Sequence, residues 1–322
     1  MKFSPILIVA GEPNSIFLEI FFKTIDKLKT NNPIILIASV KLIKLQMKKL
    51  KINKKIKVLE NRNLLNNNLN NKLINVLNVN YNTNSAFTNI SSKSNKYITN
   101  CFDLAFEIIK KNKINKFING PVVKRTFLKK NYLGITEYIS KKFNIKKNAM
   151  LIYNKNLSVC PVTTHLPLKF VAKKINKKNI TEKIKLINEF YKKKFNKKPK
   201  IAVLGLNPHC ESIEKFNEDE KIIKPTVRLL KKLNYRVSGP HSADTIFINK
   251  NRKKFDVILG MYHDQVLTPI KTLFEYDAIN ITLGLPFIRV SPDHGPNFEM
   301  LGKNKSDPSS FFYAMRFFNE IK

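Results

Sequence analysis

Three of the five histidines in the 322-residue chain are placed where they could bind a metal ion. His165, His209 and His263 each follow a short apolar run with the length and composition of a buried strand. Open α/β sheets bind their ligands just beyond the carboxyl ends of the strands, so three such side chains can converge. Neutral imidazole suits borderline divalent ions, and three ligands leave coordination positions open for a substrate. The pattern predicts a catalytic metal site.

A simpler interpretation of these histidines remains open, since a single histidine at a strand end often does no more than hydrogen bond there. Acidic or amide side chains stand beside the histidines, namely Asn207, Asp264 and Gln265, and they favour the metal interpretation. Cys210 follows His209 directly, but neighbouring residues of an extended chain point in opposite directions. We therefore leave Cys210 out of the predicted ligand set.

A second group of candidate residues surrounds the apolar segment 278–286. The group consists of Lys271, Asn280 and Arg289. Lysine and arginine are ordinarily surface residues, but Arg289 stands within an apolar stretch where it should be buried. A buried guanidinium requires an anionic partner, and its planar donors match a phosphate or a carboxylate. This group predicts a site for an anionic small molecule.

The elements that must position these residues follow from the alternation of apolar runs and amphipathic segments, which indicates βα units around a mostly parallel sheet. The expected elements are strands at residues 6–10 and 34–39 and before each of the three histidines, and helices at 16–28, 97–111 and 309–318. We expect Thr181 and Asp307 to cap helices, and the asparagine-rich segment 61–84 to be irregular and rich in loops. The predicted fold class is α/β.

Composition limits the possible functions. The chain is 43% hydrophobic with a formal net charge of +36, and its lysines are spread between apolar residues at helical spacing. A dedicated nucleic-acid surface would concentrate them, so we expect no nucleic-acid partner, although the charge can speed the encounter with an anionic substrate. No apolar run approaches the roughly 20 residues of a membrane span, so we expect no membrane association. Three cysteines without paired spacing favour a reducing cytoplasm.

Longer motifs connect the candidate residues to a known family. They are Thr-Thr-His-Leu-Pro-Leu at 163–168, Leu-Gly-Leu-Asn-Pro-His at 204–209, Ala-Asp-Thr at 243–245, Met-Tyr-His-Asp-Gln at 261–265, Asn-Ile-Thr-Leu-Gly-Leu-Pro-Phe-Ile-Arg at 280–289 and Asp-His-Gly at 293–295. In these motifs the chain resembles the 4-hydroxythreonine-4-phosphate dehydrogenase family of vitamin B6 biosynthesis. The likeness runs in order from Gly-Glu-Pro at 11–13 to Lys-Ser-Asp-Pro at 305–308, and so covers nearly the whole chain.

The resemblance implies an architecture and an assembly. The family's fold is a two-lobed α/β/α architecture similar to isocitrate and isopropylmalate dehydrogenases, with a central cleft. We expect residues 1–130 and 270–322 to form an outer, cofactor-side lobe, and residues 131–269 to form the lobe for metal, substrate and dimerisation. The family further implies a homodimer with the active site at the subunit interface.

The resemblance also implies roles for individual residues. The divalent-metal ligands, contributed across the dimer, are His165, His209 and His263. The substrate-binding residues are Lys271, Asn280 and Arg289, with Thr136 holding the substrate phosphate. The cofactor-binding residues are Asp293, His294 and Gly295, and no G-x-G-x-x-G fingerprint of a Rossmann site is present. Lys271 and Asp244 are the catalytic candidates for proton transfer, and the sequence does not decide between them.

The implied reaction is the oxidation of 4-phosphooxy-L-threonine by NAD or NADP, aided by one divalent metal ion: zinc, magnesium or cobalt. The product, 2-amino-3-oxo-4-phosphooxybutanoate, decarboxylates to 3-amino-2-oxopropyl phosphate. A metal ion stabilises the alkoxide and the enolate of such a reaction.

The chain departs from the family pattern at several positions. Ile135 stands where the family usually has a substrate-binding histidine, and glycines expected after His209 are absent. Losing a charge-assisted phosphate contact would cost about 1.5–3 kcal/mol. Two alternatives therefore remain: a dehydrogenase of this family that acts on another phosphorylated hydroxy acid, and a non-catalytic basic binding protein on the same scaffold.

Overall fold

The chain folds into two compact units, which are described separately. The computed structural model describes residues 4–60, 69–112, 114–128, 131–132, 134–211, 216–292 and 294–321. Unit 1 comprises Met1–Ile139 and Pro286–Glu320, and unit 2 comprises Ser140–Leu285 with Ile321–Lys322. The units therefore divide after residues 139 and 285, whereas the lobes were predicted to divide after residues 130 and 269. The roles assigned to the two lobes stay predictions.

Unit 1 is built on a parallel sheet whose strands follow the order β3-β4-β2-β1-β5-β12. Its strands are β1 (Ile6–Val9), β2 (Ile34–Ala38), β3 (Ile56–Val58), β4 (Ile74–Asn78), β5 (Lys116–Asn119) and β12 (Ile288–Ser291). Every residue of β1 and β2 is buried, which explains why these strands are uninterrupted apolar runs. The expected strands at 6–10 and 34–39 are confirmed.

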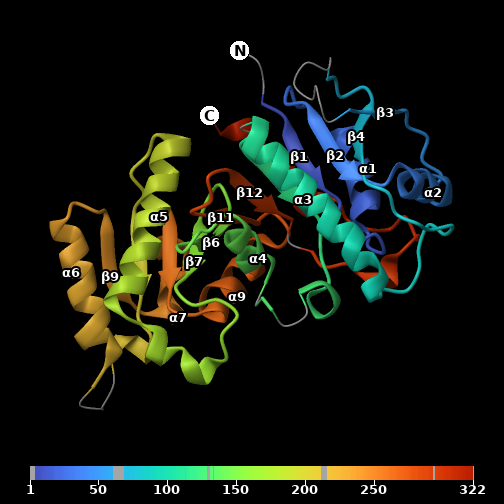
Figure 1. Ribbon diagram of the computed structural model, residues 1–322. Helices are drawn as coiled ribbons and strands as arrows, with labels where there is room; N and C mark the ends of the chain where they lie inside the picture. The colour runs from blue at the N-terminus through green and yellow to red at the C-terminus, as the bar shows by residue number, and fades with distance from the viewer. Residues whose placement is uncertain are drawn as a thin grey trace. The chain divides into compact units, whose positions relative to one another are not determined.

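Helices cover the sheet of unit 1. They are α1 (Phe17–Lys27), α2 (Val40–Leu50), α3 (Asn95–Asn112) and α10 (Ser309–Glu320). Helix α3 crosses in front of β1 and β2 in Figure 1 and contacts both strands. Helix α1 packs against α10 through Phe17 and Phe311, whose ring centroids lie 5.2 Å apart. The three predicted helices and the predicted cap of α10 are confirmed, since the Asp307 carboxylate accepts the backbone N–H of Ser309 at 2.8 Å.

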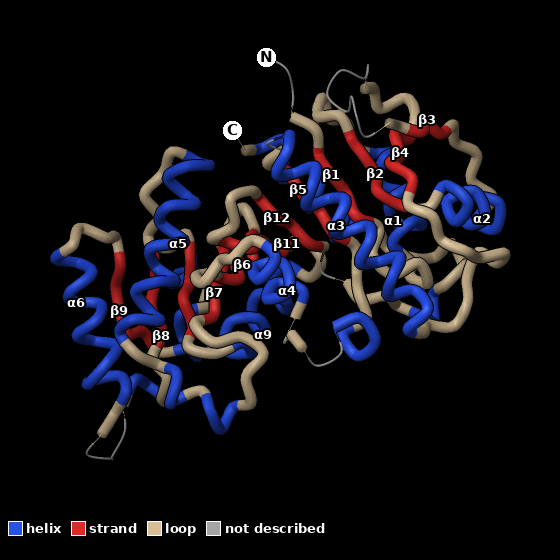
Figure 2. Tube along the Cα trace, in the orientation of Figure 1, coloured by secondary structure: helices blue, strands red, loops and turns tan. Residues whose placement is uncertain are grey.

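Unit 2 contains a mixed sheet in the order β11-β6-β7-β10-β8-β9, in which β6 is antiparallel to both of its neighbours. Its strands are β6 (Ala149–Tyr153), β7 (Ser158–Pro161), β8 (Ile201–Leu204), β9 (Val237–His241), β10 (Val257–Gly260) and β11 (Ile279–Leu283). Its helices are α5 (Lys177–Phe195), α6 (Lys224–Lys232), α7 (Ala243–Ile246), α8 (Asn249–Arg252) and α9 (His263–Phe274). Helix α5 packs on β6, α6 on β9, and α9 on β7 and β10 (Figure 2). Helix α4 (Ile135–Lys142) spans the division between the units.

Two expectations from the sequence are wrong. Thr181 does not begin a helix: α5 begins at Lys177, and the Asn176 side chain caps it by accepting the backbone N–H of Asn179 at 2.9 Å. The segment 61–84 is not wholly irregular, because β4 lies within it and is paired with both β2 and β3. Residues 61–68 of that segment lie outside the described part of the chain.

Candidate functional site

The three histidines follow neighbouring strands of unit 2. Strands β7, β10 and β8 are adjacent and parallel, with β10 in the middle. His165 lies beyond the end of β7, His263 is the first residue of α9 after β10, and His209 lies in the short 3-10 helix η6 (Pro208–Cys210) after β8. The sequence therefore predicted correctly that all three runs are strands, and the parallel pairing places their carboxyl ends at one edge.

Two pairs of groups come together at this edge. The rings of His165 and His263 have centroids 5.9 Å apart. His209 Nδ1 lies 4.0 Å from a carboxylate oxygen of Asp244, and both side chains are largely exposed. Across the described ranges of this single chain, no group of three histidine, cysteine, aspartate or glutamate side chains could hold a metal ion. Imidazole and carboxylate groups such as these are ligands that zinc and similar divalent ions accept, but the metal centre stays a prediction.

The loop that carries His209 has an unusual backbone. His209 and Cys210 have φ angles of +55° and +63°, in the left-handed region that residues with a Cβ seldom adopt. Such conformations cost roughly 1–3 kcal/mol each and persist only where surrounding contacts impose them. Strain at two consecutive residues points to a functional role for this loop.

Arg289 and Thr136 come together in unit 1. Arg289 is fully buried on β12, and its Nε donates to Asn119 Oδ1 at 2.8 Å while Nη1 donates to Thr136 Oγ1 at 3.0 Å. Burial lowers the pKa of Arg289 to about 10, and the nearby Glu137 carboxylate opposes that shift, so the side chain is a cation at neutral pH. Asn119 was missed in the sequence, where the only signal was an amide at the end of the buried run that forms β5.

Lys271 and Asn280 lie in unit 2. Lys271 stands in the last turn of α9, where burial lowers the pKa of its ammonium group. Asn280 lies on β11 opposite Ile152, and its Oδ1 is buried with no hydrogen-bond partner among the described residues. A buried amide oxygen without a partner is costly unless a ligand supplies the donor. Asn280 is therefore suited to contacting a substrate.

The predicted cofactor-binding residues belong to unit 1, and Asp293 lies outside the described residues. His294 lies over Phe17, with centroids 6.4 Å apart and planes at 24°. Burial lowers the pKa of His294, and its Nε2 is buried without a hydrogen-bond partner in the described part of the chain. A Cβ at Gly295 would meet no atom within 4 Å, so a ligand can approach the backbone there.

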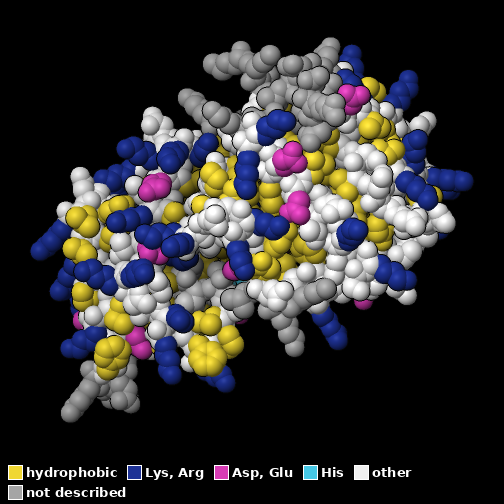
Figure 3. All heavy atoms as spheres, viewed as in Figure 1, with side chains coloured by type: hydrophobic (Ala, Val, Ile, Leu, Met, Phe, Trp, Pro, Cys, Tyr) yellow, Lys and Arg dark blue, Asp and Glu magenta, His cyan; other side chains and the backbone are white. Residues whose placement is uncertain are grey.

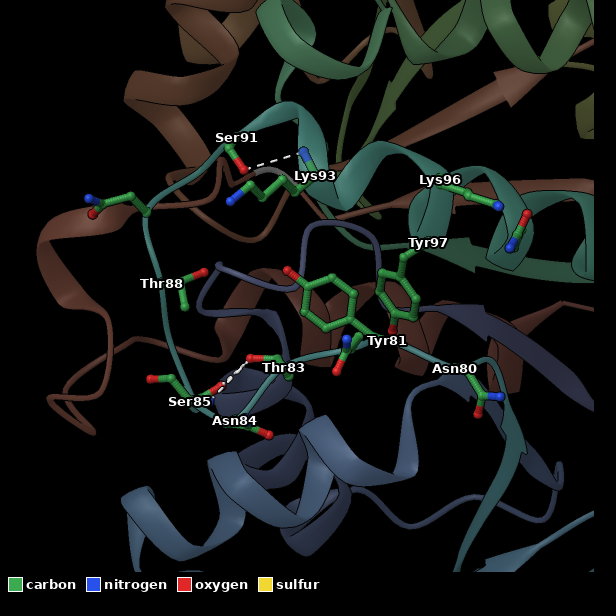
Figure 4. Close-up of a pocket in the computed structure, with 13 residues that line it drawn as sticks. Asn80, Tyr81, Thr83, Asn84, Ser85, Thr88, Ser91, Lys93, Lys96 and Tyr97 are labelled. Carbon is green, nitrogen blue, oxygen red and sulfur yellow. Dashed lines mark hydrogen bonds between the residues drawn. The ribbon is translucent and has the colours of Figure 1, made fainter.

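A cavity of about 930 Å³ lies elsewhere in unit 1, between the loop after β4 and the first turns of α3 (Figure 4). Lys93 and Lys96 line it, together with Tyr81 and Tyr97, whose ring centroids are 4.8 Å apart. None of the predicted site residues is among the residues that line this cavity. The cavity therefore adds no support to the predicted site.

Comparisons with known proteins show what the chain is similar to. The family model described as pyridoxal phosphate biosynthetic protein PdxA matches residues 29–318. The 4-hydroxythreonine-4-phosphate dehydrogenase of Sulfurihydrogenibium sp. (strain YO3AOP1) is 37% identical over 314 residues, which is 96% of this chain and 95% of the relative. The D-threonate 4-phosphate dehydrogenase of Pectobacterium atrosepticum is 34% identical over 224 residues, or 66% of this chain and 69% of the relative.

Solved structures are similar to this chain in fold, and one of them carries the same enzyme description. A structure described as a putative 4-hydroxythreonine-4-phosphate dehydrogenase from Salmonella typhimurium superposes with a TM-score of 0.86 at 27% identity, covering 98% of this chain and 99% of that one. Isocitrate dehydrogenase from Methylococcus capsulatus superposes with a TM-score of 0.51 at 10% identity, covering 98% of this chain and 85% of that one. The second likeness concerns the fold alone, and it confirms the predicted architecture.

Proposed function

Because the chain belongs to the pyridoxal phosphate biosynthetic protein PdxA family, whose members are dehydrogenases, we propose that it oxidises 4-phosphooxy-L-threonine. The observation that carries this proposal is the 37% identity with a dehydrogenase of that name over 96% of the chain. The secondary hydroxyl of the substrate loses a proton and its carbon transfers a hydride to NAD or NADP. The resulting 2-amino-3-oxo-4-phosphooxybutanoate loses its carboxylate as CO2, and protonation of the same carbon gives 3-amino-2-oxopropyl phosphate.

The described residues support parts of this reaction. Arg289 supplies a buried cation beside the Thr136 hydroxyl, and Thr136 lies in the first turn of α4, where free backbone N–H groups favour an anion. We assign these two residues to the substrate phosphate. Lys271 and Asn280 are assigned to the rest of the substrate, and either Lys271 or Asp244 accepts the hydroxyl proton.

A divalent metal ion forms part of the proposal. His165, His209 and His263 would hold it, with ligands from both subunits of a homodimer whose active site lies at the interface. Imidazole donors favour zinc or cobalt over magnesium. When bound, the ion supplies a Lewis acid at the oxygen that loses its proton.

The nicotinamide cofactor is assigned to the segment that contains His294 and Gly295, with Asp293. The unpartnered Nε2 of His294 offers a hydrogen bond, and the open space at Gly295 lets a cofactor approach the backbone. We further propose a cytoplasmic location, which the free and buried thiols of Cys101 and Cys160 support.

The experiment incubates purified protein with Zn²⁺ or Co²⁺, NAD or NADP, and 4-phosphooxy-L-threonine, and follows the absorbance of the reduced cofactor. Turnover with release of CO2 supports the proposal. D-Threonate 4-phosphate is the competing substrate, because a relative is named for it and Ile135 stands beside Thr136. Turnover of that compound alone would favour a dehydrogenase with altered specificity, and Ile135→His should then restore oxidation of the threonine phosphate. Turnover of neither, with salt-sensitive retention on DNA, would favour a non-catalytic basic binding protein.

A further inference from the structure

We propose that Asp219, Gln265 and Thr163 are positioning residues that tie together the three strand ends carrying His209, His263 and His165. The inference rests on the proposed metal site and goes beyond its ligands. Its basis is a set of hydrogen bonds within unit 2, all made by side chains that are partly or fully buried and that would not themselves touch the metal ion.

Asp219 fixes the chain that leads to His209. Its carboxylate is fully buried and accepts the backbone N–H of Leu206 at 2.8 Å and that of Asn207 at 3.1 Å. The same carboxylate accepts the side-chain amide of Asn207 at 2.9 Å. Three N–H donors satisfy a buried charge that would otherwise be very costly. A carboxylate 10 residues after His209 therefore determines the course of the backbone just before it.

The fixed backbone accounts for the strained conformation of the loop. After Asn207 the chain must turn sharply, and His209 and Cys210 take up positive φ angles. Gly205 permits this close packing, because a Cβ there would lie 2.6 Å from Cys210 Sγ and 2.7 Å from Asp219 Oδ1. Without the Asp219 carboxylate, the loop would be free to relax and His209 would lose its defined position.

Gln265 joins the His209 strand end to the His263 strand end. Its Nε2 donates to the carbonyl oxygen of Gly205 at 2.8 Å, and its Oε1 accepts the backbone N–H of Met261 at 2.7 Å. Gly205 follows β8 and Met261 follows β10, so one amide side chain spans two adjacent strand ends. Both polar ends of the amide are used, which fixes its orientation.

Thr163 completes the connection to the His165 strand end. The carbonyl oxygen of Met261 accepts the Thr163 hydroxyl at 2.8 Å and the Thr163 backbone N–H at 3.2 Å. Met261 is therefore bound on one side by Thr163 and on the other by Gln265. The three loops form one hydrogen-bonded unit, and a displacement of any one of them is resisted by the other two.

The test measures Co²⁺ binding to the full-length protein by its visible absorbance, using the metal alone. Asp219→Asn places an amide N–H₂ group among three N–H donors, and Gln265→Glu keeps the acceptor for Met261 but loses the donor to Gly205. Both variants should bind Co²⁺ roughly 10- to 100-fold more weakly than wild type, as expected for groups that orient metal ligands. Dehydrogenase activity should recover as Co²⁺ is raised.

Tyr191→Phe is the matched control, because it removes a buried hydrogen bond of 2.9 Å to Ser158 at the opposite end of β7. Tyr191→Phe should lower the urea concentration at the midpoint of unfolding, yet its affinity for Co²⁺ should stay within about twofold of wild type. If Asp219→Asn fails to fold, Gln265→Glu decides. Wild-type affinity in the folded variants would overturn this inference alone. Failure of the wild-type protein itself to bind Co²⁺ would overturn both the inference and the proposed metal site.

Discussion

At the scale of single residues, Arg289 shows how unit 1 keeps a cation in its interior. A buried guanidinium is tolerated only where its donors are satisfied, and Asn119 and Thr136 each accept one of its N–H groups. These two partners are neutral, and Glu137 is the carboxylate that helps to keep Arg289 protonated. A pKa of about 10 leaves the cation intact at neutral pH.

Lys271 gives a pH-dependent prediction. Only the neutral amine can accept the substrate proton, so kcat/KM should rise with pH and level off above the pKa of Lys271. Burial lowers that pKa below its usual 10.5, so the plateau should be reached at lower pH than for an exposed lysine. Lys271→Arg keeps the charge but removes the base, and we expect kcat/KM to fall by roughly 100- to 10,000-fold. Initial rates measured across neutral and alkaline pH check both expectations.

The dependence of kcat/KM on pH should also be measured for Asp244→Asn. Because Asp244 lies near His209 rather than on α9, its loss should weaken the rate while the alkaline rise remains. The assignment of the base to Lys271 fails if the rise persists in Lys271→Arg and disappears in Asp244→Asn.

Among the helices and strands, the start of α5 should contribute measurably to stability through its cap. Asn176→Ala removes the side chain that caps the helix, and the free energy of unfolding should fall by about 1 kcal/mol. Thr181→Ala is the control, since Thr181 lies inside the helix and its buried hydroxyl has no hydrogen-bond partner among the described residues. That change should be neutral or stabilising, because alanine has the higher helix propensity. Urea unfolding followed by circular dichroism measures both changes. If Thr181 were the cap, Thr181→Ala would lower the free energy of unfolding more than Asn176→Ala.

The same helix shows what periodicity can predict. The apolar face of α5, with Ile184 and Ile187, follows from the spacing of the sequence, whereas its first residue depends on which of several polar side chains meets a free N–H group. Strand β4 was missed because its sequence, Ile-Asn-Val-Leu-Asn, contains asparagines like the segment around it. Only its pairing between β2 and β3 makes it a strand.

For the candidate site, the sequence predicted the residues at strand ends but not their supports. Three histidines after apolar runs could be identified because strand ends meet at one edge of a sheet. Asp219 could not be identified, because its hydrogen bonds to Leu206 and Asn207 join positions that lie 13 and 12 residues apart in the sequence. Nothing in local spacing distinguishes this buried carboxylate at the start of a short helical segment from an exposed one.

At the scale of the whole molecule, the net charge of +36 is a property of the surface rather than of one site. Lysine and arginine side chains are scattered over the face in Figure 3 instead of forming one band. Scattered positive charge attracts anionic substrates from a distance and is screened by salt. Within the described ranges, no helix has the length and apolar character needed to cross a bilayer.

If the metal ligands come from both subunits, two inactive variants should restore activity when they form a dimer together. The rings of His165 and His263 lie 5.9 Å apart in one chain, so we expect them to serve the same site, with His209 supplied by the partner. Unfolding and refolding His209→Ala together with His263→Ala should give mixed dimers with one intact site each. Random pairing makes half of the dimers mixed, so activity should return to roughly a quarter of wild type. The pair His165→Ala and His263→Ala should recover no activity. If this pair regained activity and the first pair did not, the three ligands would be divided between the subunits in a different way.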